Sequence, residues 1–134
     1  MAGQALKYLY SLRIIEVEGR CPAWRSGGAS KYAEEIQKAA KKEFDAPYDV
    51  PVVALIDLFY NSEKNHAPDV DNAEKLIFDS LKRVAISDDR LIVETKTKTH
   101  DTSQVMQFDD EPIFLIDLLM KGVLAYTVIR IYEK

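Results

Sequence analysis

Residues 68–81 read PDVDNAEKLIFDSL. This stretch decides the local fold, because acidic residues typical of a helix start are followed directly by apolar residues at helical spacing. Asp71 with Glu74 makes an acidic variant of a capping box, which satisfies backbone N–H groups at a helix start. The residues that follow recur at helical intervals on one stripe: Ala73, Leu76, Ile77, Ser80, Leu81 and Val84. The pattern predicts a helix from about residue 72 to about residue 84.

Strands are predicted on both sides of this helix. Residues 52–60 are apolar and β-branched apart from Asp57, as expected of a strand that is covered on both faces. Residues 91–98 alternate in polarity after a turn at Asp88 and Asp89. The same reasoning predicts a first strand over residues 6–17 and a last strand over residues 123–132.

The remaining segments complete a single domain. Pro and Gly make residues 19–28 a loop, and helical spacing predicts a helix from Ser30, a potential N-cap, to residue 44. Residues 113–120 have the start and stop signals of a short buried helix, but a strand there fits nearly as well. The chain is therefore predicted to be one α+β domain, residues 1–134, with a mixed sheet of about four strands covered by two or three helices.

Length and composition set outer limits on the function. With 134 residues, 47% of them hydrophobic, the chain suits one ordinary core. It has no apolar run long enough to cross a bilayer and no secretory pattern at its start, so we expect a cytoplasmic protein without a membrane partner. Cys21 is the single cysteine, which excludes an intramolecular disulfide and a cysteine-based zinc site and favours a buried thiol.

The formal net charge of -4 argues at first against a nucleic-acid partner, because phosphate binding usually leaves a basic surface. The acidic charge is concentrated, however. Residues 101–120 contain five Asp or Glu side chains and no Lys or Arg, so the remainder of the chain carries -4 + 5 = +1.

Four carboxylates flank the predicted helix of residues 72–84. Asp69 and Asp71 would project to the same side of an extended segment, and Asp88 and Asp89 follow the helix. Such a group suits Mg²⁺, which takes oxygen ligands and often uses one or two carboxylates plus a substrate phosphate. Lys75, four residues beyond Asp71, adds a cation.

Each of these features alone has a structural explanation. The two acids at the helix start are typical of capping and dipole complementarity, and the Asp88-Asp89 pair is typical of a turn. Lys75 would then be a solvated side chain paired with Asp71 or Asp79.

Other polar and aromatic residues are weighed in the same way. His66 and His100 lack metal-ligand spacing and are interpreted as loop residues, with His66 having a minor prospect of contacting phosphate. Lys96 and Lys98 are interpreted as a solvated strand face, with phosphate-backbone contact as the alternative. Trp24, Tyr32 and Phe78 are expected in the core. The candidates for DNA binding are Arg20, Arg25, Lys64, Lys96 and Lys98.

Taken together, three motifs resemble the signature of the RusA family of Holliday junction resolvases, the crossover junction endodeoxyribonucleases. They are Asp-x-Asp-Asn-x-x-Lys at 69–75, Phe-Asp-x-Leu at 78–81 and Asp-Asp at 88–89, and the resemblance covers residues 68–98 closely. It implies a homodimeric, Mg²⁺-dependent endonuclease, with Mn²⁺ as a substitute, that nicks a four-way DNA junction symmetrically in recombination and repair. Residues 113–132 are the favoured dimer contacts, with completion of the core as the alternative.

The resemblance also implies roles for individual residues. Asp69, Asp71 and Asp89 would be the metal-binding catalytic carboxylates, and Lys75 the catalytic or phosphate-contacting lysine. Two further residues would have secondary roles: Asp88 as the adjacent acid and Asn72 as a residue that steadies the loop.

The chain departs from the family pattern in places. Residues 62–68 are only mildly basic, and the acidic 101–120 segment has no counterpart in the family. Two alternatives therefore stay open: a non-catalytic RusA-like module that binds DNA or protein, and a phage or prophage nuclease acting on flaps or forks.

Overall fold

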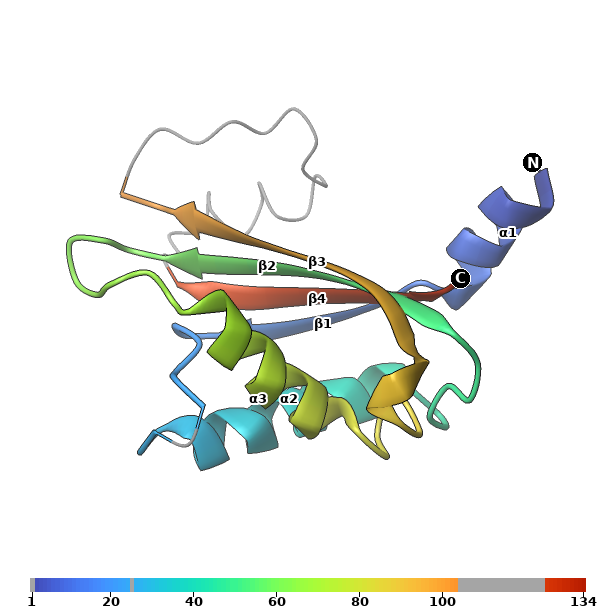
Figure 1. Cartoon of the computed structure of the whole chain (residues 1–134), viewed down its shortest axis with the longest axis horizontal. Helices are drawn as coiled ribbons and strands as arrows, with labels where there is room; N and C mark the ends of the chain where they lie inside the picture. The colour runs from blue at the N-terminus through green and yellow to red at the C-terminus, as the bar shows by residue number, and fades with distance from the viewer. Residues whose placement is uncertain (1, 25, 104–124) are drawn as a thin grey trace.

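The computed structural model describes residues 2–24, 26–103 and 125–134, with side chains described from residue 6 onward. It is an α+β arrangement in which the helices α2 and α3 pack against one side of a four-stranded sheet, and α1 lies at the end of the sheet next to the C-terminus (Figure 1). The elements are α1 (Ala2–Ser11), β1 (Arg13–Glu18), α2 (Ala29–Glu43), β2 (Val52–Tyr60), α3 (Val70–Leu81), the 3-10 turn η1 (Asp89–Leu91), β3 (Ile92–Asp101) and β4 (Tyr126–Glu133).

The sheet has the strand order β1-β4-β2-β3 and is mixed, as predicted. β2 and β3 are parallel, and α3 connects them as the crossover that a parallel pair requires. β4 is antiparallel to both β1 and β2 and lies between them. Among the described strands, β1 and β3 are consequently the edges of the sheet. The β2–α3–β3 unit contains both of the predicted carboxylate pairs.

The core lies between the sheet and the pair α2 and α3. β2 has the predicted bounds, and its residues Val52, Ile56 and Leu58 are almost fully buried in that core. Ile36 of α2 and Ile77 of α3 have no exposed surface at all. The hydroxyls of Tyr32 on α2 and Thr127 on β4 are hydrogen-bonded to each other inside this layer.

The predicted strand over residues 6–17 is wrong in its first half, which forms α1, and correct from Arg13 onward. Arg13 pairs with Ile131, and β4 ends at Glu133, so a longer β1 would soon have no partner strand. Residues 2–7 are rich in good helix formers, and their local preference prevails where the sheet ends. The ring of Tyr8 packs on that of Tyr132, 4.8 Å away, and attaches the helix to β4.

Two helix boundaries also differ from prediction. α2 begins at Ala29, so Ser30 lies inside the helix, and Gly28 is the N-cap without a side-chain hydrogen bond. α3 ends at Leu81 instead of residue 84 because the chain turns there, and Arg83 adopts a positive φ of 68°.

The last strand is confirmed, since β4 spans Tyr126–Glu133. The prediction for residues 113–120, and all of the acidic segment beyond residue 103, fall on positions 104–124, which lie outside the described residues. Of the favoured dimer contacts, the described residues from Tyr126 to Ile131 complete the sheet and are mostly buried in it.

Two further findings concern membrane spans and the single cysteine. Among the described residues, no helix is long and apolar enough to cross a membrane. Cys21 is buried as predicted, and burial raises the pKa of its thiol to about 12.

Candidate active site

The start of α3 positions the first pair of acids. Asp69 is the N-cap in extended conformation, and its Oδ1 accepts a hydrogen bond of 3.1 Å from the backbone N–H of Asn72. Asp71 lies in the first helical turn, so the predicted capping role belongs to Asp69 and not to Asp71. The segment 69–71 is not extended throughout, because the helix begins at Val70. Asn72 supplies only its backbone N–H to this cap, so its predicted role of steadying the loop stays a prediction.

The two acids of the second pair, Asp88 and Asp89, make different contacts. Asp88 caps η1 by accepting a 2.9 Å hydrogen bond from the backbone N–H of Arg90, and the Arg90 guanidinium also donates to both carboxylate oxygens. These hydrogen bonds hold the pKa of Asp88 far below its usual range. Asp89 instead approaches the C-terminal end of α3, where its Oδ2 lies 3.4 Å from Nζ of Lys82.

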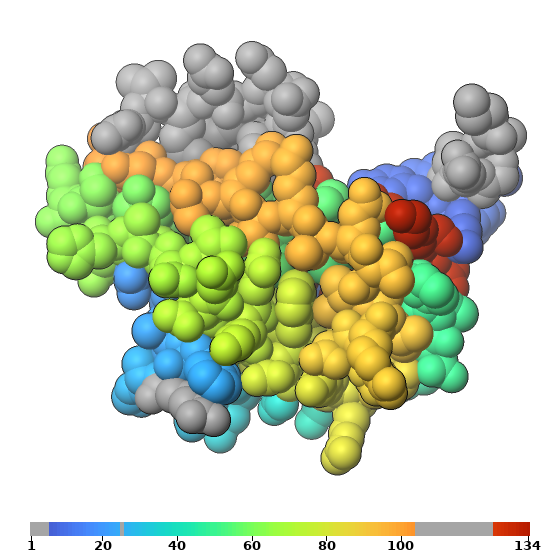
Figure 2. Space-filling model, in the orientation of Figure 1, coloured from blue at the N-terminus to red at the C-terminus, as the bar shows by residue number. Residues whose placement is uncertain are grey.

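One acid of each pair, Asp71 and Asp89, lines the same cavity on the exposed side of α3. The cavity has a volume of about 450 Å³ and is lined by Asp71, Glu74, Lys75, Phe78, Asp79 and Asp89. Figure 2 shows the yellow-green surface of α3 beside the gold surface of the residues that follow it. Three of the four predicted catalytic residues therefore share this cavity, while Asp69 is outside its lining and holds the start of the helix.

Two lysines, Lys75 and Lys82, contribute positive charge at this site. Nζ of Lys75 lies 4.6 Å from the ring centroid of Trp24, a cation–π contact that connects α3 to the loop after β1. Lys82 lies between Asp79, at 3.8 Å, and Asp89, so it partly neutralises the carboxylates. Lys75 thus has Trp24, and not Asp71 or Asp79, as its close partner.

Sequence reasoning missed the roles of Trp24 and Lys82. The i, i+3 spacing of Asp79 and Lys82 signals their pairing in a helix, but the contact with Asp89 depends on the turn at residues 82–88. Trp24 and Phe78 are partly buried against the core, and Tyr32 is buried within it, which confirms the expectation for these aromatic residues.

The geometry of the carboxylates bears on metal binding. Within the described part of the chain, no three His, Cys, Asp or Glu side chains are close enough together to hold a metal ion. Asp71 and Asp89 nevertheless line the same cavity.

The predicted DNA-binding residues lie in separate places. Nε of Arg20 donates a 2.8 Å hydrogen bond to the carbonyl of His66, just before α3, and Arg20, Lys64 and His66 line one cavity. Arg25 lies outside the described residues. Lys96 and Lys98 line another cavity, together with Asp57 and Arg130, on the side of the sheet opposite α3.

His100 is a strand residue of β3, so its interpretation as a loop residue is wrong. Its Nε2 lies 2.8 Å from Oδ1 of Asp57, and its ring stacks on Phe59 at 4.5 Å. Asp57 is the only polar residue in the run 52–59, and that interruption was the one available signal of a buried polar contact.

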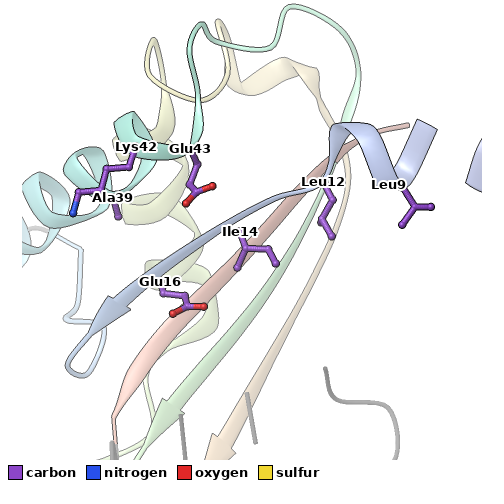
Figure 3. A pocket seen from close by; sticks show the side chains of 7 residues that line it. All are labelled: Leu9, Leu12, Ile14, Glu16, Ala39, Lys42 and Glu43. Carbon is purple, nitrogen blue, oxygen red and sulfur yellow. The ribbon is translucent and has the colours of Figure 1, made fainter. Parts of the chain in front are cut away.

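A roomier cavity of about 600 Å³ lies away from these groups, between α1, the edge strand β1 and α2 (Figure 3). Leu9, Leu12 and Ile14 line one side of it, and Lys42 and Glu43 line the other. Its lining combines apolar side chains with a few solvated charges. None of the described residues predicted for the functional site lines this cavity.

Comparison with known proteins agrees with the motifs of this site. The family model described as Endodeoxyribonuclease RusA matches residues 13–107, which include β1, α2, β2, α3, η1 and β3. No curated protein matches the chain. The matched region covers more than half of the chain and contains all of the residues that line the carboxylate cavity. The chain therefore belongs to the RusA family of endodeoxyribonucleases.

Proposed function

We propose that this protein is a structure-specific endonuclease that resolves four-way DNA junctions by paired, symmetric hydrolysis of phosphodiester bonds. The observation that supports it best is the cavity shared by Asp71, Lys75 and Asp89, three residues that match the family motifs. A cluster of carboxylates beside a lysine is suited to a reaction in which negative charge develops on a phosphate.

The donor set fits Mg²⁺, and Mn²⁺ would be a substitute. Besides Lys75 and Phe78, the cavity lining offers carboxylate oxygens only, which are the hard ligands that Mg²⁺ prefers. Two protein carboxylates are enough, because the ion keeps several waters and binds substrate phosphate. Asp71 and Asp89 would hold the ion. Asp69 would contribute through Oδ2, since its Oδ1 accepts the capping hydrogen bond.

The chain's own groups then divide the work. A bound Mg²⁺ supplies polarisation of the phosphate and an activated water. Lys75 supplies positive charge to the transition state, and Trp24 orients its ammonium group through the cation–π contact. Lys82 limits the repulsion between Asp79 and Asp89 when no phosphate or metal is present.

The substrate also favours a homodimer. A four-way junction has near two-fold symmetry, and an isologous dimer would present two equal sites to two opposed strands. Flaps and forks would engage the same residues, so the choice among branched substrates depends on the surface around the cavity.

One alternative has a specific observation in its favour. The formal net charge is -4, and the carboxylates are not grouped as a ready metal centre within the described residues. A non-catalytic RusA-like module that binds DNA or protein would account for both facts.

The deciding experiment is cleavage of a labelled synthetic four-way junction by the full chain with Mg²⁺. We expect paired symmetric nicks from the wild type and none in a linear duplex. Asp71→Asn should lower the rate on the order of 100-fold or more, the size of effect seen when one charge-stabilising group leaves a catalytic site. DNA binding should be kept or strengthened, because the change removes negative charge.

Asp45→Asn is the matched control, since Asp45 is exposed in the loop after α2, and it should cleave like the wild type. Normal cleavage by Asp71→Asn would show that the assignment of this residue is wrong. A wild type that neither cleaves nor binds the junction at low salt would favour the non-catalytic module.

A further inference from the structure

The face of the sheet opposite α2 and α3 carries a second set of charged residues. Thr97 of β3 donates to Glu74 of α3, and Thr127 of β4 contacts Tyr32 of α2, so these odd-numbered positions face the helices. Side chains alternate along a strand, and the even-numbered neighbours on β3 and β4 therefore face the other way. We refer to that side as the outer face.

Three strands of the outer face are in register. Arg130 of β4, Leu55 of β2 and Lys96 of β3 form one row across the sheet. The next row consists of Val128, Asp57 and Lys98. The rows place Lys96, Lys98 and Arg130 around Asp57, and directly opposed and diagonal neighbours in a sheet are within reach of long side chains.

Asp57 fixes the position of Arg130. The Asp57 side chain is only 2% exposed, and a buried carboxylate is tolerated when it is paired and hydrogen-bonded. Its Oδ1 lies 2.8 Å from Nε2 of His100, and its Oδ2 accepts a 3.1 Å hydrogen bond from Arg130. Arg130 is thereby held with its side chain 17% exposed at the floor of a cavity.

The cavity has a volume of about 210 Å³ and a positive charge. It is lined by Leu55, Ile56, Asp57, Lys96, Lys98 and Arg130. Three cations and one carboxylate leave 3 - 1 = +2 on its walls. Neither Lys96 nor Lys98 forms an ion pair with another described residue, and the buried Nε of Arg130 has no hydrogen-bond partner among the described residues. A buried donor without an acceptor is costly, and an anion that reaches this Nε would remove that cost.

We propose that this cavity is a phosphate-binding site, separate from the carboxylate cavity of α3 and on the opposite face of the sheet. Arg130 would supply planar guanidinium donors, and Lys96 and Lys98 would supply point charges, a combination suited to phosphate oxygens. The phosphate would belong to a DNA backbone or be free in solution. The first source rests on the proposed function. A DNA arm would reach the cavity at the described edge of the sheet, where Lys96 of β3 is exposed.

The test compares the full chain with the double variant Lys96→Gln/Lys98→Gln. Arg130 is left intact because its loss would remove the guanidinium that pairs with the buried Asp57 carboxylate. The matched control is Lys38→Gln/Lys41→Gln, which removes the same charge from exposed positions of α2. One arm titrates inorganic phosphate and follows the backbone amide NMR signals of Leu55, Asp57 and Arg130. The other arm measures binding of a labelled four-way junction by fluorescence anisotropy, without divalent metal, over a range of salt concentrations.

Amide shifts that saturate with phosphate in the wild type and the control, but vanish in the double variant, would support a site that accepts free phosphate. If phosphate alone gives no shift, a DNA backbone site predicts about tenfold weaker junction binding by the double variant and a salt dependence lower by about two ions. Equal behaviour of the double variant and the control in both arms would overturn the proposal. Junction cleavage by the same proteins tests the proposed nuclease separately, since the phosphate titration does not depend on it.

Discussion

Asp57 is a single buried carboxylate that holds side chains of two neighbouring strands in place. The carboxylate lies in the middle of β2, and two donors from neighbouring strands, His100 and Arg130, satisfy it. The desolvation of such a pair is costly, so its net contribution to folding is modest while both partners are present. Removing the carboxylate leaves the mostly buried Arg130 guanidinium without its counter-ion.

We therefore expect Asp57→Asn to lower the free energy of unfolding by about 3 kcal/mol, because Arg130 loses its counter-charge and His100 loses its carboxylate partner. Urea denaturation followed by circular dichroism measures the change. Asp45→Asn, at an exposed loop position, should change the same quantity by less than about 0.5 kcal/mol. If both variants are equally stable, Asp57 is not the centre of this cluster.

At the scale of elements, the N-terminus of α3 has a structural role and, under the proposed function, a chemical one as well. Asp69 accepts the hydrogen bond from Asn72 and lies directly before the helix. A negative charge at this position also interacts favourably with the helix dipole. The cap needs a side-chain oxygen, whereas metal binding needs a carboxylate. Substitution can separate the two roles.

Asp69→Ala should lower the free energy of unfolding by about 1 kcal/mol, the usual cost of losing a cap. Asp69→Asn should be close to wild type in stability, since Asn is an equally good N-cap. If Asp69 also holds metal, both variants lose cleavage of the four-way junction. An Asn variant that cleaves normally would leave Asp69 with the capping role only.

The ends of β2 and β3 are tied together by Asp101. Hydrogen bonds from Ser62 and Ser103 lower the pKa of Asp101 to about 2, from an ordinary value of 3.8. A lowered pKa in the folded state means that the ionised carboxylate stabilises the fold. That contribution is complete above pH 3.8 and disappears as the pH falls towards 2.

Asp101→Asn should therefore be less stable than wild type near pH 7, and the difference should shrink through this window and vanish below pH 2. Urea midpoints measured from pH 2 to pH 7 give the comparison. A difference that is independent of pH would mean that the hydrogen bonds of Asp101 do not depend on its charge.

At the scale of the whole molecule, the sheet separates two charged surfaces. The carboxylate cavity lies on the exposed side of α3, and the basic cavity of Lys96, Lys98 and Arg130 lies on the outer face. The formal net charge of -4 therefore conceals a local positive surface, and local potential governs the encounter with DNA more than the total does.

The proposed homodimer is also a property of the whole molecule. Analytical ultracentrifugation of the 15.3 kDa chain at micromolar concentration should give a species of twice that mass. Dilution should shift the equilibrium towards the monomer if the dimer is reversible. A strict monomer at micromolar concentration would contradict the two-site scheme for a four-way junction.

The sequence by itself determined those parts of the protein that depend on local pattern. The continuous apolar run fixed β2, the apolar stripe fixed most of α3, and alternating or β-branched residues fixed β3 and β4. The motifs around Asp69, Asp71, Lys75 and Asp89 were enough to indicate the family, because a family signature consists of residue types at fixed spacings along the chain.

Only the tertiary structure decided how distant residues meet. Residues 6–11 form a helix because the partner strand ends, and no property of those residues states where β4 stops. The contacts of Lys75 with Trp24 and of Lys82 with Asp89 depend on loop paths. His100 and Arg130 lie 43 and 73 positions after Asp57 along the chain. Strand order and register alone bring the three residues together. The physical reason is that periodicity reports which face of an element is buried, whereas partners across a sheet are selected by the packing of the whole chain.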